Sequence, residues 1–506
     1  MSRPPRRRRL LWLVAGLVAV GLLAAGGALI LLSSEPGDVS NPEVEFTATE
    51  PATKAAEPPA RRSRGGGFDW PVYGFTKART RYLPLEKPLR PPFAERWKVS
   101  GSVLLEFPPA MGRRSLYLLK NNGALYGISR KTGRVRWKRK LGYLAASQPA
   151  YGHNTVFVVL LQRGRGIRKG RVVAVSAKDG HTRWSRKLPS RAESSPLLDR
   201  GRLYFGSEDG TIYALRASDG AIRWKAKASG AVKGGLALAN GRLFVGDYGG
   251  KFQAFRRSDG KLLWRTSGAS GALGLRSGNF YSTPAAAYGR VYTGNTDGFV
   301  YSYAQSTGKL AWRKKTGNYV YGSPAVAPGP GGRPTVFIGS YDGRFYALDA
   351  RSGAVRWSRR AEGRISGGAV VLGDLVFYST LAKTTTALGV TTGRRVWRTQ
   401  RGSYNPVVSN GRGIFLVGMT NLFGIDGRPP NAKRILARAR HRRYVNRLVA
   451  QRRRMIARRV RLRRSGVVFC YRSLGRRVCH KPARIVCFKR SGAKRVTCRP
   501  MRRARR

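Results

Sequence analysis

Eight tryptophans recur along the middle of the chain at nearly regular intervals. Successive gaps between them are 40, 47, 40, 40, 48, 45 and 40 residues. Seven of them end a common phrase in which a glycine lies four residues before the tryptophan, as in Asp-Gly-Ala-Ile-Arg-Trp at 219–224. This period indicates one small structural unit repeated many times, not several unrelated domains. The tryptophans are Trp97, Trp137, Trp184, Trp224, Trp264, Trp312, Trp357 and Trp397.

One repeat, 195–224, shows what each unit should form. Its short apolar segments are separated by turns at Arg200-Gly201, Asp209-Gly210 and Asp219-Gly220. The last turn predicts a tight hairpin because glycine tolerates positive φ. Four short antiparallel strands in about 40–45 residues describe one blade of a β-propeller. The tryptophan follows the last turn at a fixed offset, where its ring could wedge between neighbouring blades.

The two ends of the repeat region complete one another. Seven full units end at Trp137 through Trp397, whereas Trp97 has no preceding strands of its own. After Trp397, segments within 405–426 supply three strands that no tryptophan strand follows. We therefore predict an all-β, eight-bladed propeller whose last blade is closed by a strand near 93–99. Such closure removes the exposed sheet edges that invite aggregation.

The N-terminus carries a membrane signal. Four arginines at 6–9 precede an uncharged run at 10–32, which as a helix would be about 35 Å long, enough to cross a hydrocarbon core of about 30 Å. A cleavable secretory signal is the alternative, but its apolar core is usually about 7–15 residues and no convincing cleavage site follows Leu32. We expect an uncleaved transmembrane helix in the cell membrane, with 1–9 as a basic cytoplasmic stub and the propeller outside.

Composition sets the remaining domain boundaries. Residues 33–67 hold almost no large apolar side chains, so they cannot offset the entropy of ordering and are expected to form a disordered linker. The propeller should occupy 68–427. The tail at 428–506 has 30 Lys and Arg residues and no Asp or Glu. Its pattern at 431–464 suits a basic amphipathic helix, which two cysteine-containing hairpins follow.

The charge balance points to anionic partners. There are 98 Lys and Arg residues against 24 Asp and Glu, for a net charge of +74. Basic residues such as Lys138-Arg139-Lys140 and Arg359-Arg360 follow the tryptophans, and outermost strands would carry them to the perimeter. Outside the cytoplasm nucleic acid is disfavoured, whereas envelope proteins, anionic lipid or cell-wall polymer are favoured. The alternative is an arginine-rich surface that serves solubility alone.

Cysteines lie only in the tail. The spacings of Cys470, Cys479, Cys487 and Cys498 contain no Cys-x-x-Cys pair, so zinc binding is weakly indicated. Two hairpin disulfides, Cys470–Cys479 and Cys487–Cys498, suit an oxidising exterior, although four cysteines permit three pairings.

The repeat resembles the tryptophan-docking repeat of the PQQ-type β-propeller superfamily, and Asp-Trp-Pro-Val-Tyr-Gly at 69–74, with Arg-Thr-Arg-Tyr at 79–82, looks like its lead-in. That group includes quinoprotein alcohol dehydrogenases and non-enzymatic BamB-like propellers. The dehydrogenases imply a quinone stacked on adjacent cysteines and a calcium ion beside a catalytic aspartate. The predicted propeller has no cysteine and only 18 carboxylates. We therefore predict a BamB-like, non-catalytic binding or scaffold module without cofactor or metal; a quinone-dependent dehydrogenase or quinone-binding protein is the alternative.

Equivalent positions of the blades suggest a ligand site in the axial funnel. Alignment of the blades places one residue from each near the start of the innermost strand, where cofactor-binding relatives contact their ligand. The alternative is a set of solvated rim residues or a local ion pair worth about 0–1 kcal/mol. The candidates are Glu106, Glu193, Lys233, Tyr281 and Tyr321, and the same ring includes Ala146, Ile365 and Ser403.

Overall fold

The computed structural model describes residues 36–47, 69–269, 278–426, 444–451, 454 and four short tail segments at 469–473, 476–480, 485–488 and 497–500. The chain divides into two compact units, Met1–Pro429 and Pro430–Arg506.

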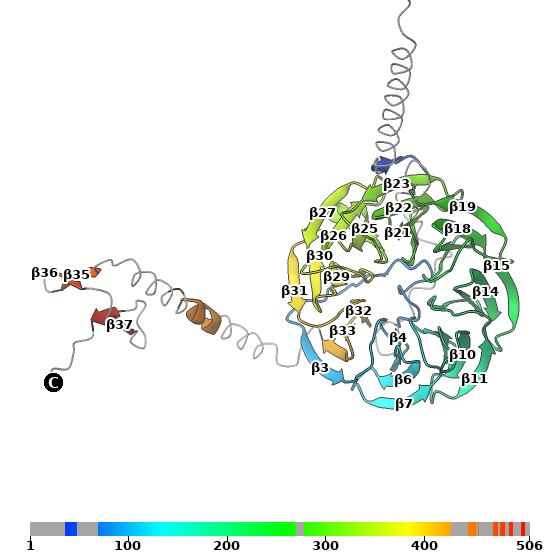
Figure 1. The fold of residues 1–506 in the computed structure, drawn as a ribbon, viewed down its shortest axis with the longest axis horizontal. Helices are drawn as coiled ribbons and strands as arrows, with labels where there is room; N and C mark the ends of the chain where they lie inside the picture. Colours follow the sequence, from blue (N-terminus) through cyan, green and yellow to red (C-terminus); the bar gives the residue numbers. More distant parts are fainter. Residues whose placement is uncertain are drawn as a thin grey trace, which may run out of the picture. The chain divides into compact units, whose positions relative to one another are not determined.

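The first unit is a ring of eight antiparallel blades, and each blade contains four strands (Figure 1). The predicted eight-bladed, all-β propeller is therefore confirmed. The first strand of each blade lies nearest the axis, and the tryptophan-bearing strand lies at the perimeter. Blade 1 contains β4 (Ala110–Met111), β5 (Ser115–Leu119), β6 (Ala124–Ser129) and β7 (Val135–Lys140). Blade 2 contains β8 (Ala150–Gly152), β9 (Thr155–Leu160), β10 (Arg171–Ser176) and β11 (Thr182–Lys187). Blade 3 contains β12 (Leu197–Asp199), β13 (Arg202–Gly206), β14 (Thr211–Arg216) and β15 (Ile222–Lys227).

The other half of the ring repeats this order. Blade 4 contains β16 (Ala237–Ala239), β17 (Arg242–Gly246), β18 (Lys251–Arg256) and β19 (Leu262–Ser267). Blade 5 contains β20 (Ala285–Ala287), β21 (Arg290–Gly294), β22 (Phe299–Ala304) and β23 (Leu310–Lys315). Blade 6 contains β24 (Ala325–Pro328), the 3-10 turn η1 (Pro330–Gly332), β25 (Pro334–Gly339), β26 (Arg344–Asp349) and β27 (Val355–Arg360). Blade 7 contains β28 (Val370–Leu372), β29 (Leu375–Ser379), β30 (Thr385–Gly389) and β31 (Arg395–Thr399).

Blade 8 is assembled from both ends of the propeller. It joins β32 (Val407–Ser409), β33 (Gly413–Val417) and β34 (Leu422–Asp426) to β3 (Ala94–Val99), which pairs antiparallel with β34. The ring centroids of Trp97 and Phe415 are 5.8 Å apart. The predicted closure of the ring by the N-terminal strand is therefore confirmed.

The tryptophans connect each blade to the next. The ring of Trp184 lies on the hairpin glycine of blade 3, Gly220, and its Nε1 donates a hydrogen bond of 2.9 Å to the Ala217 carbonyl. Equivalent Nε1 bonds to the following blade are made by Trp137, Trp224, Trp264, Trp312 and Trp357. Trp397 differs because blade 8 has no such hairpin, and its ring contacts Phe93 edge-on with centroids 5.1 Å apart. The apolar core accordingly lies between blades, as in the cluster that joins Trp137 to Val158.

Part of the predicted linker is ordered. Strand β1 (Val39–Ser40) pairs antiparallel with β23, and Val44 and Phe46 pack against the apolar cluster of blades 5 and 6. The expectation of disorder is wrong for 36–47, because these few apolar side chains and the strand pairing compensate a polar average composition. The other linker residues, the predicted anchor at 10–32 and the stub at 1–9 lie outside the described residues. No helix in the described part of the chain is long and apolar enough to cross a membrane.

The second unit holds a short helix and two hairpins among its described residues. Residues 444–451 are helical and lie within the predicted amphipathic segment. Strand β35 (Phe469–Ser473) pairs with β36 (Arg476–His480), and β37 (Ile485–Phe488) pairs with β38 (Thr497–Pro500). Cys470 is directly opposite Cys479, and Cys487 is opposite Cys498. This register suits the predicted disulfides, which stay a prediction.

Candidate functional site

The lead-in segment forms a plug across the propeller axis. Residues 69–83 end in β2 (Tyr82–Leu83), which pairs in parallel with β28. On the way the segment bonds to innermost strands around the ring, as in the 2.8 Å bond from the Ala286 N–H to the Ala78 carbonyl. Figure 1 shows this blue segment crossing the middle of the ring. Further carbonyl acceptors in the segment are Pro71, Lys77, Thr80 and Arg81.

Two arginines of the plug are buried. Arg79 is fully buried, with Nε 2.9 Å from the Leu236 carbonyl and Nη2 3.0 Å from the Ser195 carbonyl. Arg81 donates to the carbonyls of Arg79 and Pro324, and burial lowers its pKa. Carbonyl dipoles compensate the loss of hydration that buried cations suffer. The arginines therefore fasten the plug to several blades.

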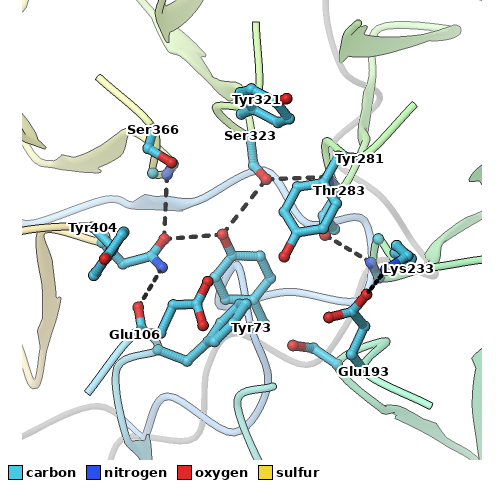
Figure 2. Close-up of a pocket in the computed structure, with 17 residues that line it drawn as sticks. Tyr73, Glu106, Glu193, Lys233, Tyr281, Thr283, Tyr321, Ser323, Ser366 and Tyr404 are labelled. Carbon is cyan, nitrogen blue, oxygen red and sulfur yellow. Dashed lines mark hydrogen bonds and ion pairs between the residues drawn. The ribbon is translucent and has the colours of Figure 1, made fainter. Parts of the chain in front are cut away.

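A cavity of about 470 Å³, counting the space open to solvent, lies beside the plug. Tyr73 stands at its centre and donates a 3.0 Å hydrogen bond to Asn405 Oδ1 (Figure 2). The structure brings together all five candidates around it: Glu106, Glu193, Lys233, Tyr281 and Tyr321. Ala146, Ile365 and Ser403 are buried and do not line the cavity.

At one side of the cavity a lysine bridges two carboxylates. Lys233 Nζ lies 2.9 Å from Glu193 and 3.4 Å from Glu208. Burial raises the pKa of Glu193, while the hydrogen bond and charge of Lys233 oppose that rise. Burial by itself lowers the pKa of Lys233, but the bond to Glu193 and the charges of both glutamates outweigh it, so the net shift is upward. The arrangement is an ion-paired group in which one lysine bridges two carboxylates.

Tyrosines and one further carboxylate make up the rest of the wall. The Tyr281 ring contacts Tyr248 and Tyr321, with centroids 6.2 and 5.9 Å apart. Burial raises the pKa of Tyr248 to about 12, so its hydroxyl stays protonated. Burial also raises the pKa of Glu106, which accepts a 3.1 Å bond from Asn121 Nδ2. The cavity therefore offers rings and hydroxyls more than charge.

Sequence reasoning missed several lining residues. Tyr73, Tyr404 and Asn405 come from the lead-in and from the connection that enters blade 8, not from the repeated position. The signal for Tyr73 was the lead-in motif itself, but only the fold shows that this motif crosses the axis. Tyr404 and Asn405 follow the position of Ser403 by one and two residues, so a wider window around the ring position finds them.

The cavity does not fit the quinone and calcium that the dehydrogenases imply. Neither aspartate nor cysteine lines it, and its charged residues are Glu106, Glu193 and Lys233. No group of three His, Cys, Asp or Glu side chains that could hold a metal ion occurs in the described residues. Pyrroloquinoline quinone carries carboxylates, and the one lysine of the wall is already paired with glutamates. The wall therefore supplies neither the cation nor the ligand set for that pair.

The perimeter of the ring is strongly basic. The residues that follow the docking tryptophans lie on the outermost strands, and many are exposed, including Lys138, Lys140, Lys187, Lys225, Lys227, Arg265, Arg359 and Arg360. The same strands also expose apolar residues two positions before the tryptophan, among them Val135, Ile222, Leu262 and Val355. The perimeter therefore carries exposed cations beside exposed apolar side chains.

Comparison with known proteins agrees with this fold. The model of the family described as outer membrane protein assembly factor BamB matches residues 168–318 and 297–428, together just over half of the chain. No curated protein matches the chain significantly.

Solved structures share the architecture at low identity. BamB from Moraxella catarrhalis is 16% identical, with a TM-score of 0.53 over 66% of this chain and 99% of that one. A quinohemoprotein alcohol dehydrogenase from Comamonas testosteroni is 14% identical, with a TM-score of 0.59 over 73% and 81%. A europium-containing methanol dehydrogenase is 14% identical, with a TM-score of 0.56 over 69% and 88%. From its family match and its eight docked blades, the chain belongs to the BamB-like family of PQQ-type β-propeller repeats.

Proposed function

We propose that this chain is a non-catalytic binding module, anchored in the cell membrane by 10–32 with its propeller outside the cytoplasm. Its basic surfaces would engage anionic partners of the envelope, and the tail at 428–506 would add to that attraction. The family description, an assembly factor of outer membrane proteins, favours a scaffold over an enzyme.

The observation that carries the proposal is the basic perimeter. Each of β7, β11, β15 and β27 presents exposed Lys or Arg side chains at the outer edge of its blade. These side chains lie around the ring instead of inside the cavity, so they suit an extended partner such as lipid or wall polymer better than a small ligand. Attraction of this kind falls as salt screens the charges.

The cavity supports a non-catalytic role. Its ionisable side chains are engaged structurally: Lys233 bridges Glu193 and Glu208, and Asn121 holds Glu106. The fold neighbours that are dehydrogenases keep a quinone-dependent reaction as the alternative. The poor fit of the wall to a quinone with calcium counts against it.

Salt dependence tests the proposal. A variant lacking 1–32 keeps every described residue, so its association with vesicles reports the basic surfaces without the anchor. Binding to vesicles of anionic lipid, or to anionic wall polymer, should fall steeply from about 0.1 M to about 1 M salt, as the Debye length shortens from about 10 Å to about 3 Å. Deletion of 428–506 should weaken it further. Binding that does not depend on salt, or that is equal on neutral lipid, would contradict the proposal.

Two further assays address the anchor and the alternative. The full chain in membranes should resist extraction at alkaline pH, which releases proteins held by charge alone. Incubation with pyrroloquinoline quinone and calcium should give no substrate-dependent reduction of a dye. Quinone-dependent dye reduction would favour the dehydrogenase.

A further inference from the structure

The segment 36–47 binds to one side of the ring. Arg313 Nε donates a 2.8 Å hydrogen bond to the Gly37 carbonyl, and the Asp38 carboxylate accepts a 2.6 Å bond from the Lys315 N–H and pairs with Lys314. Arg290 donates 2.9 Å to the Pro42 carbonyl. In Figure 1 the short dark-blue strand lies beside β23, between β19 and β27. The segment is thus fastened to the perimeter of blade 5.

Phe46 anchors the other end of this segment. The Arg290 guanidinium lies 5.0 Å from the centroid of its ring, which also stacks with Tyr288. Arg351 of blade 6 forms an ion pair of 3.0 Å with Glu43. Contacts at both ends fix the path of 36–47 across the edge of blades 5 and 6, so this stretch cannot act as a loose tether.

The docking shortens the chain between the predicted anchor and the propeller. The predicted apolar run ends at Leu32, and Gly37 is already bonded to blade 5, so five residue steps separate them. Five steps span at most about 18 Å. The chain must first cross one headgroup layer, which takes up about 5–7 Å of that distance. The edge of blade 5 would therefore stay within roughly one Debye length of the headgroups.

The strands that flank blade 5 suit such a surface. On β19, Leu262 and Leu263 are 38% and 36% exposed, and Lys261 and Arg265 beside them are exposed as well. On β27, Val355 is 44% exposed and Arg359 and Arg360 follow it at the end of the strand. Apolar side chains flanked by cations match a lipid interface, since the apolar groups enter the boundary and the cations meet the phosphates.

We propose that the outer edge of blades 4 to 6, where β19 and β27 flank the segment 36–47 that covers β23, is a docking surface for anionic lipid that holds the propeller edge-on to its own membrane. This inference rests on the proposed anchoring of the chain by 10–32. It adds that one part of the perimeter, and not the whole basic ring, faces the lipid.

Matched positions on the repeated strand test the proposal. Val135, Ile222, Leu262 and Val355 occupy the same place two residues before the tryptophan, and their exposures are 37%, 37%, 38% and 44%. Each is replaced in turn by photoreactive p-benzoylphenylalanine in the full chain, which is reconstituted in vesicles of phosphatidylglycerol and phosphatidylcholine and irradiated. Lipid adducts should form from Leu262→p-benzoylphenylalanine and Val355→p-benzoylphenylalanine, several-fold above those from Val135 and Ile222 on blades 1 and 3.

A charge change at matched positions gives the second readout. Arg265 and Lys225 each follow the docking tryptophan of their blade and are exposed. Arg265→Glu should lower the adduct yield at Leu262 several-fold, and Lys225→Glu should leave it unchanged. Equal adducts from all four positions, or none from a chain that floats with the vesicles, would overturn the docking surface alone. A chain that does not float at all would overturn the anchor and the docking surface together.

Discussion

The ring of Trp184 lies so close to Gly220 that a Cβ at the glycine would be 2.6 Å from it. Gly220 also has a φ of +74°. Gly220 thus meets two separate requirements: its backbone is left-handed, and it has no Cβ that would collide with the indole. This contact joins blade 2 to blade 3, and its counterparts recur around the ring.

We predict that Gly220→Ala destabilises the propeller more than Gly201→Ala. Gly201 in the same blade has a φ of +72° but nothing within 4 Å of its Cβ position, so it isolates the cost of the backbone conformation. That cost is about 1–2 kcal/mol, and the displaced indole should add about 1–3 kcal/mol. Chemical denaturation followed by tryptophan fluorescence measures both. Equal losses of free energy of unfolding would show that the indole moves aside freely.

Arg79→Met should lower the free energy of unfolding by about 2–4 kcal/mol, because it removes the donors to the buried Leu236 and Ser195 carbonyls and each orphaned group costs about 1–3 kcal/mol. Arg90→Met is the control. Its ion pair with Asp374, at 2.7 Å, is half exposed, and such pairs contribute about 0–1 kcal/mol. Thermal unfolding at one pH compares the two variants. An Arg79 variant as stable as the Arg90 variant would mean that the plug is not held by its arginine.

Lys233→Met should leave Glu193 partly buried without its cation and cost about 1–3 kcal/mol of stability at neutral pH. Burial already raises the pKa of Glu193, and loss of Lys233 should raise it further. When the pKa of a carboxyl is higher in the folded state than in the unfolded state, the protein loses stability as pH rises above the pKa of the unfolded state. The variant should therefore recover part of its stability near pH 5. The double variant with Glu193→Gln should show no such recovery.

Asp297 should make the stability of blade 5 depend on pH. Burial raises its pKa to about 6, even though Tyr301 and the Phe299 N–H donate to its carboxylate. Since the folded state holds this proton more tightly than the unfolded state, stability is highest at acidic pH and falls as pH rises from about 4 to about 6. The wild-type free energy of unfolding, measured relative to Asp297→Asn, should drop by about 1–3 kcal/mol across that range. A flat difference would contradict the raised pKa.

Sequence reasoning reached the blades because their signals are local and repeated. One hairpin sets the offset between Gly220 and Trp224. The eighth blade follows from the two incomplete units, at Trp97 and at 405–426, which together supply four strands. The funnel candidates follow from the same symmetry, which is why Glu193, Lys233 and Tyr281 come from equivalent places on three blades.

The parts that lie outside the repeat could not be derived in this way. Arg79 and Arg81 read as two more basic residues in a very basic chain, yet they are buried, because carbonyls of strands distant in sequence converge on them. Segment 36–47 has the composition of a linker, and only the free edge of β23 gives Val39 a partner. Both features depend on surfaces that exist once the ring has formed.

The pairing of β3 with β34 also sets an order of events during synthesis. Arg96 and its partner Asp426 are 330 residues apart, so the first perimeter strand leaves the ribosome long before the strands that it completes. Contacts of such separation form slowly, and until they form both edges of the growing arc lack a neighbour. Until the last blade is complete, those two edges are open to pairing with strands of other chains.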